Sequence, residues 1–232
     1  APILCTANCD LPAIPVAATT AAVALPANTI PAPLTTILSR NAGLSFSSSA
    51  FSIIGSLPIY PFDTFEESFG TETSITSAVG TDLIARPDCK VLGLYGTGLQ
   101  ARRHLVAMCA IRPIEEVRVY SRSADNREKF VAEMQTHCDV AIRAVDDPKD
   151  VATGADLICC ATNTNVPALY GEWLSPGQHV TSTVNSTKGV KEQAGLAKTR
   201  REIDDEVVRR ADMILVNIRE QSIVEEHGDL CE

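Results

Sequence analysis

Residues 90–105, "KVLGLYGTGLQARRHL", decide how this chain of 232 residues folds. The apolar run Lys90–Tyr95 predicts a short strand that ends at Gly96. A second glycine follows at Gly98, and the apolar spacing beyond it predicts a helix over Leu99–Ile111. A strand that passes into a helix through two glycines is typical of a loop whose backbone approaches a phosphate group.

Each small residue of this loop has its own role in a nucleotide site. Gly96 allows the tight turn out of the strand, and Gly98 leaves room for a pyrophosphate, while Ala101 lets the helix pack against the sheet. The alternative is a purely structural glycine turn. The loop stands first in a run of strand–helix units, which favours dinucleotide binding. The residues expected to line the pyrophosphate are Gly96, Thr97, Gly98, Leu99 and Gln100.

Strands and helices alternate around this loop, which predicts an α/β fold with a Rossmann-type doubly wound parallel sheet. A helix is predicted over 73–85 ahead of the first strand. The strands expected after it are 116–120, 140–145, 155–162, 177–182 and 212–217, with helices at 124–137, from 146–148 onward, and at 204–211. We assign residues 73–232 to this dinucleotide-binding domain.

Residues at the end of the second strand indicate which of NAD(H) and NADP(H) a dinucleotide site prefers. A site for NAD(H) usually has an acid there to bind the ribose 2′-hydroxyl, whereas this chain has Ser121, Arg122 and Ser123. A guanidinium beside hydroxyls suits a 2′-phosphate, so NADP(H) is favoured and NAD(H) is the alternative. Asp125 could supply the acid, but it falls at the predicted helix start. Arg122 could also be an ordinary surface arginine.

Residues 1–72 differ from the rest of the chain. They are rich in Ala, Pro, Ser and Thr, and no lysine occurs before Lys90. Prolines break any long helix in this part, although a short strand around Phe51–Ile54 is compatible with the pattern. We interpret this segment as an atypical remnant of a substrate or dimerisation domain and expect less order in it than in 85–220.

Composition excludes several classes of function. The net charge of −9 argues against a general nucleic-acid binder, which needs a basic face. The eight cysteines include no Cys-x-x-Cys pair, so we expect no metal site and reduced thiols in a cytoplasmic protein. Adjacent Cys159 and Cys160 should face opposite sides of a strand. No apolar stretch approaches the ~20 residues of a membrane span, and the N-terminus lacks the basic region of a signal peptide.

Other polar and aromatic residues are interpreted as structural. His104 and His179 have no carboxylate or cysteine at catalytic or ligand spacing, and a structural role is favoured for the histidines, which also include His137 and His227. The pairs Arg102-Arg103 and Arg200-Arg201 read as solvated helix faces, and Trp173 as a packing residue.

Several separated motifs resemble the ornithine cyclodeaminase/μ-crystallin family, in the right order. The resemblance covers residues 73–230, and the stretches that carry it are "TSAVGTDLIARPDCKVLGLYGTGLQARRHLVAM", "EVRVYSRSADNREKFVAEM", "GADLICCATNTNVPALYGEWLSPGQHVTST" and "REIDDEVVRRADMILVNIREQSIVEEHGDL".

The resemblance implies a homodimer that pairs a Rossmann domain with a substrate and dimerisation domain. It implies NAD(H) or NADP(H) chemistry on amino or imino acids: deamination of ornithine to proline, reduction of cyclic imines, or amino-acid dehydrogenation. The turn formed by Ala161, Thr162 and Asn163 would lie near the nicotinamide, and Val184 would line the cofactor on the next strand. For the turn, ordinary turn residues are the alternative.

Three departures from the family pattern bear on activity. The lysine that family enzymes carry in the N-terminal half is absent. Glu72 stands where the resemblance places the arginine that binds a substrate carboxylate, and Ser186 stands near the position of an aspartate. We expect the chain to stop short of the family's C-terminal return. The catalytic residues therefore stay unassigned, and the rival hypotheses are a noncatalytic dinucleotide-binding protein, or a remnant that binds nothing.

Overall fold

The computed structural model describes residues 3–7, 65–184, 200–216 and 229. Within these ranges the elements are β1 (Ile3–Ala7), α3 (Phe65–Ile84), β2 (Val91–Tyr95), α4 (Leu99–Ile111), β3 (Glu116–Tyr120), α5 (Ala124–Met134), β4 (Ala141–Ala144), α6 (Pro148–Ala152), β5 (Leu157–Cys160), the 3₁₀ turn η1 (Gly171–Trp173), β6 (His179–Ser182), α8 (Asp205–Arg209) and β7 (Ala211–Val216).

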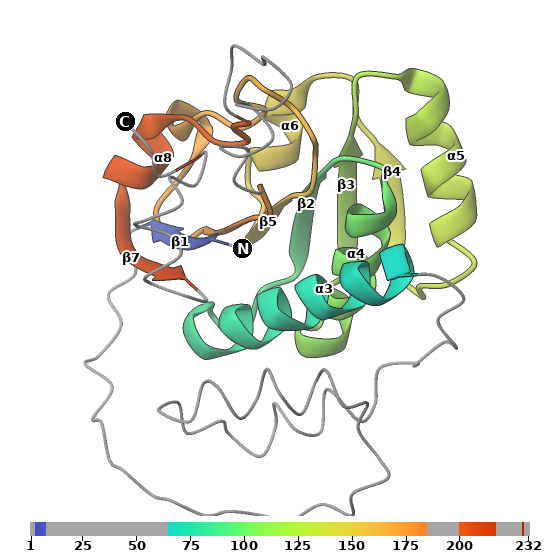
Figure 1. Ribbon diagram of the computed structural model, residues 1–232, viewed down its shortest axis with the longest axis horizontal. Coiled ribbons are helices and arrows are strands. Elements are labelled where there is room, and N and C mark those ends of the chain that lie inside the picture. The colour runs from blue at the N-terminus through green and yellow to red at the C-terminus, as the bar shows by residue number, and fades with distance from the viewer. Residues whose placement is uncertain (1–2, 8–64, 185–199, 217–228, 230–232) are drawn as a thin grey trace, which may run out of the picture. The chain divides into compact units, whose positions relative to one another are not determined.

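The described strands form one sheet in the order β4-β3-β2-β5-β6-β1-β7 (Figure 1). From β2 the chain moves outward to β3 and β4, then returns to the other side of β2 for β5 and β6. These strands pair in parallel, which confirms the predicted Rossmann-type doubly wound sheet. The difference is β1, which sequence patterns did not predict. It pairs antiparallel with both β6 and β7, so this edge of the sheet is mixed.

The reversal of strand order at β2 places a ligand site at its carboxyl end. Tyr95, the last residue of β2, is level with Tyr120 of β3 and with Cys160 of β5. The loops that follow these three strands therefore leave the sheet at one point, where open α/β sheets bind their ligands.

The helices around the sheet begin where the sequence supplies caps. Ser123 accepts a hydrogen bond from the Asn126 amide at the start of α5, and Asp147 accepts one from the Lys149 amide at the start of α6. Pro148 occupies the first turn of α6, where its missing N–H costs nothing. The predicted helix start at 146–148 is thus confirmed.

Two apolar clusters pack against the faces of the sheet. One joins the sheet to α4 and α5 and contains Leu94 and Phe130, and the other joins it to α6 and α8 and contains Val151 and Val207. Neighbouring Cys159 and Cys160 belong to different clusters, which confirms that they face opposite sides of β5. Within the described residues, no disulfide joins the cysteines Cys89, Cys109, Cys138, Cys159 and Cys160.

Buried histidines tie α3 to its neighbours. His104 of α4 makes hydrogen bonds with the Gln100 carbonyl and the Ser77 hydroxyl, and burial lowers its pKa to about 4. His179 of β6 contacts the Thr81 hydroxyl at 3.1 Å, and burial lowers its pKa to about 3. Both rings are neutral packing groups, which confirms the structural interpretation for these two positions.

Some expectations differ at element ends or fall outside the described ranges. Helix α3 begins at Phe65 rather than near Thr73, and α5 ends at Met134 rather than at 137.

Within the described ranges, no helix is long and apolar enough to cross a membrane, and no group of His, Cys, Asp and Glu side chains could hold a metal ion. The expectations for Phe51–Ile54, Ser186, His227 and most of residues 1–72 lie outside the described residues.

Candidate functional site

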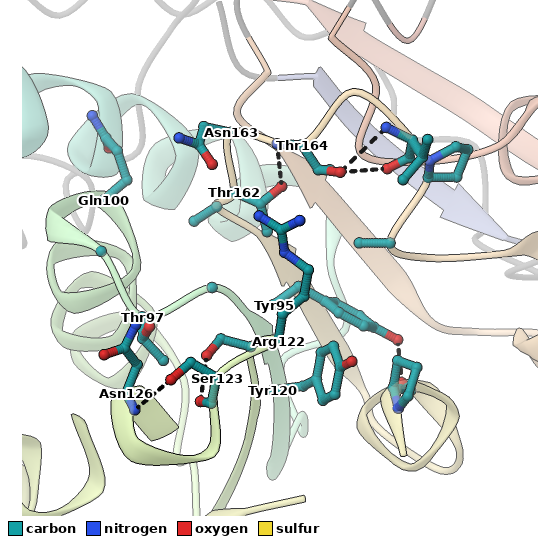
Figure 2. Close-up of a pocket in the computed structure, with 18 of the residues that line it drawn as sticks. Tyr95, Thr97, Gln100, Tyr120, Arg122, Ser123, Asn126, Thr162, Asn163 and Thr164 are labelled. Atoms are coloured by element: carbon teal, nitrogen blue, oxygen red, sulfur yellow. Dashed lines mark hydrogen bonds between the residues drawn. The ribbon is translucent and has the colours of Figure 1, made fainter. Parts of the chain in front are cut away.

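A pocket of about 710 Å³ opens at the carboxyl ends of β2, β3 and β5 (Figure 2). Its size falls in the range of small-molecule and cofactor sites. The lining residues are Tyr95, Gly96, Thr97, Gly98, Leu99, Gln100, Tyr120, Ser121, Arg122, Ser123, Asn126, Pro148, Ala161, Thr162, Asn163, Thr164, Val166, Pro167, Ala168, Tyr170 and Trp173.

The two glycines of the loop after β2 serve different purposes. Gly96 has φ +109°, and a Cβ built on it would lie 2.2 Å from the carbonyl oxygen of Ala161. This position is reserved for glycine by the fold itself. Gly98 has an ordinary φ of −82°, and nothing lies within 4 Å of a Cβ built there. That open space is part of the pocket, so a side chain at Gly98 would occupy room available to a ligand.

Helix α4 points its N-terminus at this space. Gly98 is its N-cap, no side chain caps the first turn, and the first turn carries no acid. The free amides and the helix dipole therefore favour an anion at this end. The Oε1 atom of Gln100 is buried and has no hydrogen-bond partner within the described residues. An open cradle, an uncapped helix and an orphaned amide oxygen fit the pyrophosphate and sugar of a dinucleotide.

Arg102 links the glycine loop to helix α5. Its Nε and Nη2 donate to both carboxylate oxygens of Glu133 at 2.8 and 2.7 Å, and its Nη1 donates to the Thr97 carbonyl. The expected solvated surface arginine is thus a half-buried link between α5 and the glycine loop. Because its donors are engaged and it does not line the pocket, it is not a phosphate ligand.

The loop after β3 supplies the positive charge of the pocket. Arg122 is exposed and points into the pocket in Figure 2. No hydrogen bond or ion pair of its guanidinium occurs within the described ranges. Arg127 fixes the loop beneath it, since it donates to the Ser121 carbonyl at 2.6 Å and to Asp146 at 2.5 Å. The lining residues that the structure describes include no Asp, Glu, Lys or His, so Arg122 is the one charged side chain among these described residues.

Aromatic side chains form the other walls. Tyr95 and Tyr120 meet edge to face with ring centroids 6.5 Å apart, and the Tyr95 hydroxyl donates to the Pro148 carbonyl at 2.7 Å. On the far side, the rings of Tyr170 and Trp173 pack together, with their centroids 4.8 Å apart. Trp173, expected to serve only packing, is therefore also a wall of the pocket.

A buried carboxyl group forms hydrogen bonds with the turn after β5. Glu202 accepts hydrogen bonds at Oε1 from the Thr162 amide and from the Thr162 hydroxyl, the latter at 2.7 Å. Its Oε2 accepts from Ser182 and from the Thr183 amide, both at 2.9 Å. Burial, opposed by these hydrogen bonds, raises the pKa of Glu202 to about 7.

This raised pKa predicts how stability changes with pH. The unfolded chain releases the Glu202 proton near pH 4.5, whereas the folded protein keeps it up to about pH 7. The stabilisation from this proton is complete below about pH 4.5 and is lost as pH rises to about 7, with a slope of at most ~1.4 kcal/mol per pH unit. Urea unfolding at several pH values should show this slope in the wild type and a shallower one in Glu202→Gln. Equal slopes in both proteins would contradict the assignment.

Most of the predicted site residues line the same pocket. The glycine-loop residues 96–100, Ser121 and Arg122, and the turn 161–163 all line this one pocket. Val184 does not; it is buried, with 2% of its surface exposed. Asp125 lies in the first turn of α5 and is not a lining residue. Ser123, noted beside Arg122 in the sequence, also lines it. Sequence reasoning did not single out Tyr120 and Asn126, nor the Glu202 network.

A family model settles the relationship to known proteins. The model described as the ornithine cyclodeaminase/mu-crystallin family matches residues 70–231. This chain belongs to that family. The matched range agrees with the range of the resemblance, residues 73–230.

Relatives in the ornithine cyclodeaminase/mu-crystallin family are similar over the same part of the chain. Ketimine reductase mu-crystallin of Mus musculus is 32% identical over 158 residues, 68% of this chain and 45% of that protein. Putative dehydrogenase RB0419 of Rhizobium meliloti is 32% identical over 148 residues, 64% of this chain and 42% of its own length. The chain thus spans less than half the length of these family members.

A solved structure of the family shows the same fold. Delta(1)-pyrroline-2-carboxylate reductase of Thermococcus litoralis, in complex with NADH and L-proline, superposes with a TM-score of 0.54 and 32% identity. The superposition covers 61% of this chain and 41% of the reductase. The NADH and L-proline of that complex are ligands of the reductase.

Proposed function

We propose that this chain binds a nicotinamide dinucleotide in the pocket at the ends of β2, β3 and β5, with NADP(H) preferred over NAD(H). Its chemistry would be hydride transfer at the amino or imino carbon of a small amino or imino acid. The observation that carries the cofactor proposal is the open glycine cradle, together with a lining whose described residues include one charged side chain, Arg122, and no carboxylate.

Each part of the pocket has a role in this proposal. The first turn of α4 would stabilise the pyrophosphate, and Gly98 keeps its space free. Arg122, with the hydroxyls of Ser121 and Ser123, would bind the ribose 2′-phosphate through charge-assisted hydrogen bonds. The bound dinucleotide supplies the hydride. The turn at Thr162 would border the nicotinamide and limit the access of water.

The family relatives support the chemistry. Their names include a ketimine reductase and a pyrroline-2-carboxylate reductase, which act on carbon–nitrogen double bonds. The solved relative holds NADH, so NAD(H) is the alternative cofactor here. Calorimetric titration with NADPH and NADH, followed by a screen of amino acids and cyclic imines, tests both parts. Failure of both nucleotides to bind would refute the proposal.

A second candidate is a noncatalytic dinucleotide-binding protein. Among the described residues that line the pocket, none is a carboxylic acid, a lysine or a histidine that could move a proton at a substrate. Tight binding of NADPH with no turnover of any amino acid or imine would favour this candidate.

Arg122→Ala is expected to weaken NADPH binding about tenfold, the effect of losing one charge-assisted contact, and to change NADH binding by less than about twofold. Calorimetric dissociation constants for both nucleotides measure this. Arg209→Ala is the matched control, because Arg209 is exposed on α8 and pairs with Glu206 outside the pocket. If Arg122→Ala bound NADPH as tightly as the wild type, the 2′-phosphate role would be wrong.

A further inference from the structure

Two buried carboxyl groups meet a single hydroxyl behind the wall of the pocket. Glu202 is fully buried and Asp229 is 3% exposed. The Ser182 hydroxyl oxygen, at the end of β6, lies 2.9 Å from Oε2 of Glu202 and 2.5 Å from Oδ2 of Asp229. Both distances are those of hydrogen bonds that involve a carboxyl group.

The hydrogen count of these contacts requires an extra proton. A serine hydroxyl has one hydrogen, so Ser182 can donate to Glu202 or to Asp229 but not to both. If both carboxyls were ionised, the Ser182 oxygen would face one buried carboxylate oxygen with no hydrogen between them. Two unpaired acceptors in such a contact would cost free energy. One carboxyl must therefore be protonated and donate to the Ser182 oxygen, while the hydroxyl donates to the other carboxylate.

The remaining oxygens of the pair are used to hold the backbone. Oδ1 of Asp229 accepts from the amides of Glu202 and Ile203 at 2.8 and 3.2 Å. Glu202 in turn accepts from Thr162 after β5 and from the Thr183 amide after β6. The network therefore joins the end of β6 to the turn that lines the pocket.

Few other charges act on this pair in the part of the chain that the structure describes. Arg201 is the nearby cation. Its charge only partly opposes the rise that burial causes in the pKa of Asp229, and it forms its ion pair with Asp205. The Cys159 thiol of β5 is the other titratable neighbour of Glu202, and burial raises its own pKa. Burial also raises the pKa of both carboxyls, in the direction that retains a proton.

We infer that Glu202 and Asp229 share one proton across Ser182 and act together as positioning residues for the Thr162 turn. With the proton in place, every contact of the pair is a hydrogen bond and the turn is held. When the proton leaves to solvent at higher pH, two adjacent anions compete for one hydroxyl, and their repulsion loosens the link to Thr162. The consequence for nucleotide affinity rests on the proposed function, but the shared proton does not.

The shared proton is tested without nucleotide by nuclear magnetic resonance. The amide resonances of Thr162 and Thr183, which donate to Glu202, should shift together with one apparent pKa between about pH 6 and 8. In Asp229→Asn, the side-chain amide donates permanently to Ser182, so this titration should disappear. The control Glu128→Gln, which neutralises an exposed carboxyl of α5, should titrate like the wild type. Amides that do not titrate, or that titrate equally in Asp229→Asn, would overturn the shared proton.

The positioning role is tested by fluorescence titration with NADPH between about pH 6.5 and 8.5. Wild-type affinity should fall about fivefold relative to Asp229→Asn across this range, the value of one ordinary hydrogen bond. The ratio of the two dissociation constants at each pH cancels the titration of the nucleotide itself. A constant ratio would overturn the positioning role. If the wild type bound no nucleotide at any pH, the proposed function would fail, and the amide titration would still decide the shared proton.

Glu202→Ala separates support of the turn from simple charge effects. It removes the acceptor of both Thr162 donors, and NADPH affinity should fall about tenfold or more. Affinity equal to the wild type would overturn the positioning role. If this variant does not fold, Asp229→Asn alone decides the matter, because its side chain mimics the protonated carboxyl and leaves Glu202 in place.

Discussion

Replacing Gly98 with valine is expected to weaken nucleotide binding by on the order of a hundredfold or more while the protein stays folded. The Cβ at this position would enter open space, so it meets no protein atom within 4 Å. The branched side chain would fill the part of the pocket proposed for the pyrophosphate. Calorimetric titration with NADPH measures the loss, and urea unfolding should show a change of no more than about 1 kcal/mol at this N-cap position.

Gly96→Ala is the matched contrast to this substitution. Its Cβ would lie 2.2 Å from the Ala161 carbonyl oxygen at a φ of +109°, so it should destabilise the fold by about 3 kcal/mol or more. The two glycines of one loop should thus separate binding from stability. If Gly98→Val bound NADPH like the wild type, the proposed path of the pyrophosphate would be incorrect.

Turnover of ornithine by this 232-residue chain is expected to lie near the uncatalysed background. An α-amino-acid substrate brings a carboxylate, which a site neutralises with a cation, usually a bidentate arginine. By the family resemblance, Glu72 of α3 would stand at the position of that arginine, and no lysine occurs among residues 1–89. Losing a charge-paired contact costs about 3 kcal/mol or more, and each ~1.4 kcal/mol is tenfold in rate.

The measurement follows proline and ammonia released from ornithine with added NAD⁺ or NADP⁺. NADPH binding by the same sample shows that the domain is folded, and a cyclic imine without a carboxylate is the control substrate, because it needs no arginine. Conversion of ornithine at an ordinary enzymatic rate would refute this expectation and would show that other cations of the chain bind the substrate carboxylate.

The strand–helix order and the glycine loop could be predicted because local forces determine them. Lys90–Tyr95 is apolar, the two glycines interrupt it, and Asp147 and Pro148 mark a helix start within a few residues. The family motifs then placed the turn at Thr162 near the cofactor, and the structure brings this turn to the same pocket as the glycine loop.

The rest of the site depends on contacts between distant segments. Tyr170 and Trp173 reach the pocket because of how their loop packs, which no local periodicity reveals. Glu202 stands in "RREIDDE", a run of charges that is typical of a solvent-exposed segment. In the structure it is buried, and its carboxyl accepts hydrogen bonds from Thr162, Ser182 and Thr183. Val184, which the resemblance placed beside the cofactor, is buried and is not among the described lining residues of the pocket.

The strand β1 has a consequence for how the protein reaches its native state. Its residue Ile3 pairs with Ser182 of β6 and with Val216 of β7. Residues that are far apart along the chain must therefore meet before these hydrogen bonds form. The order β6-β1-β7 also means that β7 joins the sheet through β1. Contacts so distant along the chain form slowly, whereas β2 to β5 are joined by short connections. Folding should therefore begin around the glycine loop and finish at the mixed edge, where segments from opposite ends of the chain are joined last.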